Sequence, residues 1–345
     1  MLSSFCDTAF SSTGNHGEVL GTSDNFKVIK ALALDDIADL RITRNAPLRD
    51  YTRFGLGGPA DLLIDAPDEV SFSSAWQRLA ESGVAIEVIG GGSNLVVSDE
   101  GFRGVVLRYT ADFLRQESAV HVSAGAGAIL QNLVDLTIRL GLHGIHTMTG
   151  IPGWVGGAIY GNAGAYGRSI DLSITRVRFF DGARIREFSN PECGFRYRES
   201  TFKDHKGWIV LSTELELLPA DTAELRDAAD SIRSFRDAKY PPSMKCAGSI
   251  FKNLIFSELP ESVQAQVDPK VVREGKVPSA WFLERAGAKG LRNGDIHVAD
   301  YHANLIYNAG DGTALEVQEL IGDLKARVRS AFGFEVEEEV QYIGF

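Results

Sequence analysis

Two glycine-rich segments constrain this chain more than any other feature. The first reads VIGGGSNL at residues 88–95, so an apolar run leads directly into three glycines and two small polar residues. The second contains seven glycines between Gly150 and Gly167. Backbone without Cβ atoms adopts positive φ readily and can turn successive N–H groups toward one anion. One triple-glycine run alone is more often a tight turn, but two such segments predict a site for a long ligand that carries phosphate groups.

The spacing of these glycines argues against the most familiar nucleotide-binding loop. Neither segment matches the GxGxxG fingerprint of a Rossmann dinucleotide site. Ordering seven glycines costs much conformational entropy, so we expect residues 150–167 to form neither a regular helix nor a strand.

Composition excludes several classes of partner. The 345 residues carry 35 basic and 46 acidic side chains, a net charge of −11, so we expect no nucleic-acid partner. No apolar stretch approaches the ~20 residues of a membrane helix, and we expect no membrane association. The three cysteines, Cys6, Cys193 and Cys246, lack the spacing of metal ligands. We therefore expect no metal site and a reducing compartment, the cytoplasm.

Apolar periodicity and capping residues predict an α+β fold. Between residues 37 and 220 we expect helices at 68–82 and 129–140 and strands at 61–65, 86–89, 176–180, 184–188 and 208–217. Residues 1–36 lack the pattern of a secretory signal, and we expect a flexible extension there.

The C-terminal third has its own helix signals. Asp221 and Glu224 have capping-box spacing and open a helix that reaches about Lys239, where two prolines follow. Thr313 and Glu316 open a second helix that Gly333 ends, and a strand is expected at 334–343. We therefore predict two domains, residues 37–220 and 221–345.

Several motifs occur in an order that points to one family. They read TRFGLGG at 52–58, IGGGSNLVVSDEGFRG at 89–104, GIPGWVGGAIYGNAGAYG at 150–167, YRES at 197–200, AGSIFKN at 247–253, HANLIYN at 302–308 and EVQYIG at 339–344. Together they resemble the UDP-N-acetylenolpyruvoylglucosamine reductase (MurB) family over roughly residues 45–344. The short interval between residues 203 and 236 resembles the second class of that family, which lacks an inserted tyrosine loop.

The resemblance implies a fold and a reaction. It implies an FAD-binding domain of the vanillyl-alcohol oxidase/p-cresol methylhydroxylase (PCMH) type, followed by an α+β substrate-binding domain. NADPH would reduce a non-covalently bound FAD, which would pass hydride to the enolpyruvyl group of a UDP-sugar. The product would be UDP-N-acetylmuramate, a peptidoglycan precursor. We expect a monomer or a weak oligomer.

By this resemblance both glycine-rich segments hold FAD. The assigned residues are Gly90, Gly91, Gly92, Ser93, Asn94, Leu95, Gly150, Ile151, Pro152, Gly156, Gly157, Ala158, Asn162, Gly164, Tyr166 and Gly167.

The implied chemistry assigns roles to three further residues. Hydride addition at C3 of the enolpyruvyl ether leaves negative charge on C2 and its carboxylate, and C2 must then be protonated. Ser249 occupies the family's proton-donor position, and the planar fork of Arg198 suits a carboxylate. Glu339 would add a hydrogen bond to the same charge. Strand alternation in the acidic run 335–339 does not distinguish Glu339 from Glu338, and only the resemblance assigns the role to Glu339.

Family positions also suggest a substrate pocket. The assigned residues are Tyr197, Asn253, Lys276, His302 and Lys239, with Lys276 at the phosphates. A lone His or Lys is usually a satisfied or solvated side chain. Without the family context, a surface ion pair of Arg198 with Glu199 or Glu192 is a commoner role than catalysis.

Two rival functions stay open at this point. The first is a flavin oxidase or dehydrogenase with the same cofactor fold; such relatives often attach flavin through His or Cys, and neither glycine-rich segment contains a histidine. The second is a non-catalytic binding module, against which the joint presence of Ser249, Arg198 and Glu339 argues.

Overall fold

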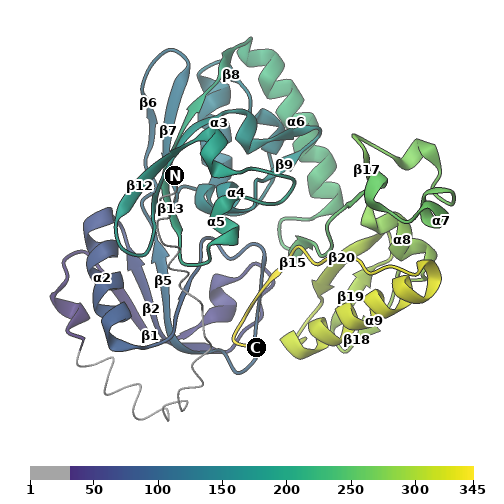
Figure 1. The fold of residues 1–345 in the computed structure, drawn as a ribbon, viewed down its shortest axis with the longest axis horizontal. Helices are drawn as coiled ribbons and strands as arrows, with labels where there is room; N and C mark the ends of the chain where they lie inside the picture. The colour runs from purple at the N-terminus through teal and green to yellow at the C-terminus, as the bar shows by residue number, and fades with distance from the viewer. Residues whose placement is uncertain (1–31) are drawn as a thin grey trace, which may run out of the picture.

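The computed structural model describes residues 32–345, which form two lobes joined by a long helix (Figure 1). Most of the predicted N-terminal extension, and Cys6, lie outside the described residues. The N-terminal lobe, purple to teal in Figure 1, contains two large sheets, and the C-terminal lobe, green to yellow, contains one.

The first sheet has the strand order β1-β2-β5-β3. Its strands are β1 (Arg41–Pro47), β2 (Pro59–Ala66), β3 (Ile86–Val88) and β5 (Phe102–Tyr109). β5 pairs in parallel with both β2 and β3, whereas β1 pairs antiparallel with β2. Helix α2 (Glu69–Ser82) packs on β2; the Asp68 side chain caps its first turn, and Gly83 ends it at φ 71°.

The second sheet is antiparallel, with the order β12-β11-β13-β7-β6. Its strands are β6 (Leu114–Gln116), β7 (His121–Gly125), β11 (Ile174–Phe180), β12 (Ile185–Ser189) and β13 (Ile209–Glu216). One apolar core joins it to the first sheet and to α3 (Leu130–Arg139). Short elements complete the lobe: β4 (Leu95–Val97), β8 (Leu142–His143), α4 (Val155–Tyr160), β9 (Gly164–Ala165), β10 (Arg168–Ser169), α5 (Thr201–Asp204) and β14 (Leu218–Pro219).

The C-terminal lobe is built on an antiparallel sheet with the order β15-β20-β19-β18. Its strands are β15 (Lys245–Ser249), β18 (Arg292–Asn293), β19 (Ile296–Ala299) and β20 (His302–Asn308). Its core also contains the apolar faces of α8 (Ser279–Arg285) and α9 (Ala314–Phe332). The predicted capping box of Thr313 and Glu316 opens α9. The remaining elements are β16 (Leu254–Ile255), α7 (Glu261–Gln264) and β17 (Lys276–Val277).

Helix α6 (Thr222–Lys239) joins the lobes, and its packing corrects a predicted boundary. Leu225 and Ala229 belong to the core of the N-terminal lobe, so the helix that we assigned to the second domain packs on the first. The chain passes from the N-terminal lobe to the C-terminal lobe at about Tyr240. At the other end, Leu34 is only 4% exposed and packs on the same core, so the predicted extension cannot reach residue 36.

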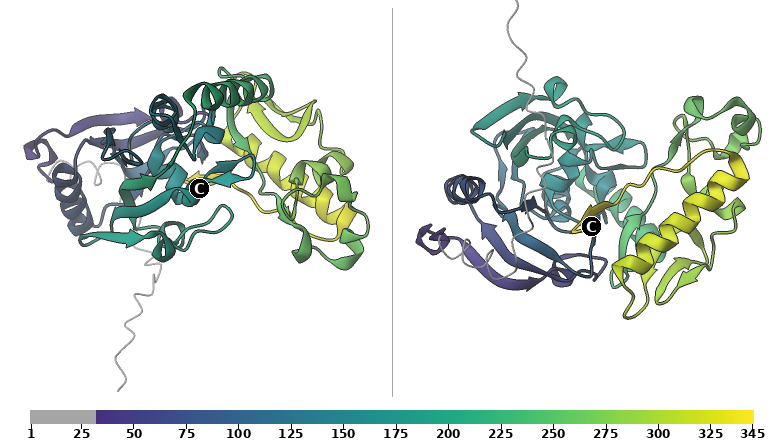
Figure 2. Two further views of the ribbon diagram at one scale, coloured as in Figure 1. Left: turned by 90° about the horizontal axis from the view of Figure 1, so that it is seen from above. Right: turned by 60° about the horizontal axis from the view of Figure 1, so that its bottom comes forward.

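The chain returns to the N-terminal lobe at its end. Strand β21 (Gln341–Ile343) pairs in parallel with β4, and Figure 2 shows the yellow segment crossing back from α9. The predicted strand at 334–343 is wrong for residues 334–340, where most of the backbone pairs with no strand. Glu335 and Glu338 in this stretch form ion pairs with Lys325 of α9 instead. Among residues 32–345, no helix combines the length and apolar character needed to span a membrane.

Candidate active site

A cavity of about 680 Å³ lies where the two lobes meet. Its walls come from both glycine-rich segments, from the loop after β12, from the end of α6, from β15 and from β21. Clefts between domains are a common place for ligand sites.

The first glycine-rich segment forms one wall. All six predicted residues, Gly90 to Leu95, line the cavity. Gly92 has φ 63°, and a Cβ there would collide with the carbonyl oxygen of Tyr51. No acceptor among residues 32–345 bonds the backbone N–H groups of residues 90–94. These groups are therefore free to bind a phosphate-bearing ligand.

Gly92 allows a test of this wall. We expect Gly92→Ala to cost about 1–3 kcal/mol in strain and to weaken retention of the FAD that the sequence predicts, since the loop would have to move. Flavin content after gel filtration and thermal unfolding with and without added FAD measure both effects. Gly322→Ala in α9, where a Cβ meets nothing, is the control. Full retention of flavin by Gly92→Ala would contradict the assignment of this loop.

The second segment forms another wall, with only some of the residues assigned to it. Ile151, Pro152, Gly156, Gly157, Ala158 and Gly164 line the cavity, whereas Gly150, Asn162, Tyr166 and Gly167 do not. Asn162 is buried and donates to the carbonyl of Arg196, and Tyr166 is half exposed. The expectation of no regular structure here is also wrong, because α4 forms within the segment.

Gly157 and the charges of the walls match a bulky anionic ligand. A Cβ on Gly157 would meet nothing within 4 Å, so this glycine opens onto free space. Five basic residues line the cavity, against two acidic ones. The basic residues are Arg53, Arg198, Lys203, Lys206 and Arg236, and the acidic ones are Glu87 and Glu339. The cavity is thus basic in a chain whose net charge is −11.

The structure brings Arg198 and Glu339 together. Arg198 Nε lies 2.7 Å from Glu339 Oε1, and its Nη2 donates to the carbonyl of Gly164 at 3.2 Å. Arg198 has φ 58°, a left-handed backbone that costs energy for a non-glycine residue and is common at functional sites. The alternative of an ion pair with Glu199 is wrong, because Glu199 binds Lys203 and Lys252 instead.

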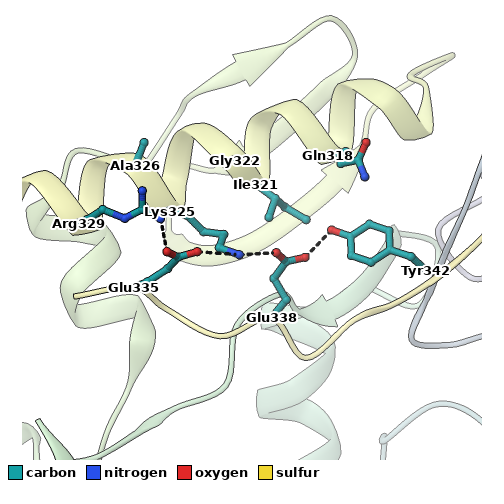
Figure 3. A pocket seen from close by; sticks show the side chains of 9 residues that line it. All are labelled: Gln318, Ile321, Gly322, Lys325, Ala326, Arg329, Glu335, Glu338 and Tyr342. Carbon is teal, nitrogen blue, oxygen red and sulfur yellow. Dashed lines mark hydrogen bonds and ion pairs between the residues drawn. The ribbon is translucent and has the colours of Figure 1, made fainter. Parts of the chain in front are cut away.

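Glu338 faces the opposite side of the chain from Glu339. It contacts Lys325 of α9 at 2.9 Å and accepts a hydrogen bond from Tyr342, in a smaller pocket of about 320 Å³ (Figure 3). Burial and the hydrogen bond to Glu338 raise the pKa of Tyr342, so its hydroxyl stays protonated. Only Glu339 of the pair lines the large cavity.

Ser249 lies at the end of β15, where the pairing with β20 is irregular. Its hydroxyl lines the cavity, 3.2 Å from the hydroxyl of Tyr240. The preceding Gly248 has φ 80° and opens onto free space.

The predicted substrate residues divide into two groups. Tyr197 and Asn253 line the cavity, and the Tyr197 hydroxyl accepts from the Asn253 backbone N–H at 3.2 Å. Lys276, Lys239 and His302 lie behind the walls: the Lys276 ammonium is 4.7 Å from the Tyr197 ring centroid, and the other two flank Tyr240. Direct lining by these three is therefore not observed.

Sequence reasoning assigned no role to several lining residues. They are Arg53, Gly153, Trp154, Arg236, Tyr240 and Gln341. Arg53, Gly153, Trp154 and Gln341 fall inside the motifs quoted above, which was the available signal. Arg236 and Tyr240 lie near the end of α6 outside any motif, and only the fold brings them to the cavity.

The chain matches two domain families. Residues 240–343 match "UDP-N-acetylenolpyruvoylglucosamine reductase, C-terminal domain", and residues 60–183 match "FAD binding domain". Two similar relatives are named UDP-N-acetylenolpyruvoylglucosamine reductase. The one from Solibacter usitatus is 56% identical over 313 residues, covering 91% of this chain and 100% of its own length. The one from Rubrobacter xylanophilus is 37% identical over 300 residues, covering 86% and 94%.

A solved structure shows the same architecture. The UDP-N-acetylenolpyruvylglucosamine reductase of Thermus caldophilus superposes with a TM-score of 0.69 at 29% identity. The match covers 88% of this chain and 100% of that one.

Proposed function

Since the chain belongs to the UDP-N-acetylenolpyruvoylglucosamine reductase family, we propose that its central cavity binds FAD and the enolpyruvyl UDP-sugar side by side. The enzyme uses NADPH to reduce the enolpyruvyl group, which gives UDP-N-acetylmuramate for peptidoglycan synthesis. The observation that carries the proposal is the convergence of Ser249, Arg198 and Glu339 on one cavity with two glycine-rich walls.

The walls of the cavity fit FAD. The unbonded N–H groups of residues 90–94 suit its diphosphate, and Gly157 leaves room for a bulky group. Arg53 and Arg236 add positive charge. When bound and reduced, FAD supplies the hydride that adds to C3 of the substrate.

Arg198 and Glu339 act on the negative charge that develops on the substrate. Glu339 forms an ion pair with the guanidinium and the Gly164 carbonyl accepts a hydrogen bond from Nη2, so the planar group is oriented before substrate arrives. A preorganised donor stabilises a developing carboxylate charge without reorganisation at the moment of reaction. Ser249 then donates its hydroxyl proton to C2.

The neighbouring glutamates give a matched test of Glu339. We expect Glu339→Gln to lower kcat by about tenfold or more, since it loosens the Arg198 guanidinium. Glu338→Gln should leave kcat unchanged and lower the free energy of unfolding by about 1 kcal/mol, since it removes a half-buried contact with Lys325. Steady-state kinetics and urea unfolding of both variants check this. An equal loss of kcat in both would contradict the assignment.

Three further expectations follow from this function. A UDP-sugar is too polar to cross a lipid bilayer, so we place the enzyme with its substrate in the cytoplasm. Lys276 contributes positive charge near Tyr197 for the substrate phosphates.

We keep the two-domain division, with α6 assigned to the first domain, and a monomer or weak oligomer as the expected state.

One anaerobic experiment tests the function. NADPH should bleach the yellow flavin, and the enolpyruvyl sugar nucleotide should restore the oxidised spectrum. Reoxidation by oxygen alone would instead favour a flavin oxidase. Colour that stays on the denatured chain would do the same, because the proposed FAD is not covalently attached. Binding of FAD without any turnover would favour a non-catalytic module.

A further inference from the structure

Tyr240 connects the candidate proton donor to a histidine behind the cavity wall. Its hydroxyl lies 3.2 Å from Ser249 Oγ and 3.3 Å from His302 Nε2. The three side chains come from the end of α6, from β15 and from β20. Tyr240 and Ser249 line the cavity, whereas His302 does not and is partly exposed to solvent.

The chemistry of Ser249 creates a need for such a connection. A serine hydroxyl is a very weak acid, and a free alkoxide in a partly desolvated cavity is costly. Donation to C2 is therefore easiest when a second proton reaches the serine oxygen as the first one leaves. Tyr240 is the hydroxyl placed within hydrogen-bond distance to supply it.

We propose that His302 and Tyr240 form a proton relay that reprotonates Ser249 during each turnover, an inference that rests on the proposed function. The Ser249 O–H bond breaks as the C–H bond forms at C2. The Tyr240 hydroxyl proton moves to the serine oxygen, and the Nε2 proton of His302 moves to the tyrosine oxygen. His302 Nδ1 takes one proton from solvent, which balances the one delivered to carbon. Proton exchange with solvent then returns the imidazole to its Nε2–H form before the next turnover. No oxidant or reductant takes part.

The surroundings of the relay support this direction of transfer. Burial is the main cause that lowers the pKa of His302 to about 4. The charges of Lys239 and Lys289 also lower this pKa, whereas that of Glu284 raises it. The imidazole is therefore neutral at neutral pH and has one donor and one acceptor nitrogen. Burial likewise raises the pKa of Tyr240 and keeps its hydroxyl protonated at rest.

Two cations face the aromatic ring of Tyr240, whose hydroxyl passes the proton on. The Lys239 ammonium lies 5.1 Å and the Arg236 guanidinium 5.7 Å from the Tyr240 ring centroid. An adjacent positive charge stabilises the negative charge that a phenol gains as its proton leaves. Lys239, which does not line the cavity, thus acts on the reaction through Tyr240.

The test compares Tyr240→Phe and His302→Gln in the flavin-loaded enzyme. Each should slow substrate reduction about a hundredfold and leave flavin reduction by NADPH unchanged. The double variant should lose no more than either single variant, because both changes break one chain. Tyr301→Phe is the control, since that hydroxyl is exposed and bonds only the Lys239 carbonyl among residues 32–345.

Two readouts separate a relay from a packing role. The wild-type rate of substrate reduction should depend non-linearly on the deuterium fraction of the solvent, because several protons move, and that of Tyr240→Phe should depend linearly. Nitrogen NMR of labelled histidine in the resting protein should show His302 neutral and protonated at Nε2 at pH 7. If wild type turns over normally, any of three results overturns the relay alone. These are a His302 that carries its proton on Nδ1, a double variant that is slowed by the product of the two single losses, and a Tyr240→Phe variant that keeps the non-linear dependence on deuterium. Absent turnover of wild type overturns the proposed function itself.

Discussion

Ser249→Ala is expected to slow reduction of the enolpyruvyl substrate by about 10²–10⁴-fold while NADPH still reduces the flavin at close to the wild-type rate. The change removes a proton donor and leaves the glycine-rich walls in place. Rapid mixing without oxygen separates the two half-reactions, because each changes the flavin spectrum in the opposite direction.

A serine on the outer face of α6 provides the control. Ser234 bonds the carbonyl of Asp230 in an exposed position, and Ser234→Ala should change neither half-reaction. If Ser249→Ala slowed both half-reactions to the same extent, Ser249 would be needed for the cofactor site and not for protonation.

Arg198→Lys is expected to lower kcat by about 10²–10³-fold. Lysine keeps the charge but loses the planar fork that Glu339 and the Gly164 carbonyl hold in place. The loss should fall mainly on kcat, since the interaction strengthens as charge moves onto the substrate carboxylate. Steady-state kinetics with varied sugar nucleotide measures the division between kcat and KM.

Arg196→Lys is the matched comparison two residues away. Arg196 forms an exposed ion pair with Asp204, and its replacement should leave kcat unchanged. A rise in KM alone for Arg198→Lys would mean that Arg198 only helps to bind the substrate.

Elements with local signals could be predicted from the sequence. The bounds of α2, α3, α6 and α9, and of strands β2, β3, β11, β12 and β13, agree with the expected ranges within two residues. Their ends are set by neighbouring residues: Asp68 caps α2, Thr313 and Glu316 cap α9, and Gly83 and Gly333 take positive φ.

Features set by contacts distant in the sequence could not be predicted in this way. The sequence predicts a strand at 334–340, yet Lys325 and Arg329 of α9 bind Glu335, and Lys325 also binds Glu338. The glycines of α4 disfavour a helix, but Val155 and Ile159 bury their side chains in the core and compensate.

The candidate site shows the same division. The resemblance chose Glu339 over Glu338, and the structure explains why the two point apart, since Asn94 bonds the Glu339 carbonyl at 2.8 Å and Gln341 donates to Asn94 at 3.0 Å. The sequence did not predict a role for Tyr240, because a tyrosine at a helix end before two prolines belongs to no functional motif. Its contacts with Ser249 of β15 and His302 of β20 arise only in the folded chain.

The pairing of β21 with β4 has a consequence for biosynthesis. Residues 341–343 line the cavity and pair with β4, which directly follows the first glycine-rich segment. This wall of the cavity is therefore incomplete until the ribosome has added residues 341–343. The N-terminal lobe can collapse around its own core much earlier, but tight capture of the coenzyme has to wait for the final strand. Gain of yellow colour during translation would therefore follow the folding of residues 341–343, and removal of residues 341–345 would release the flavin.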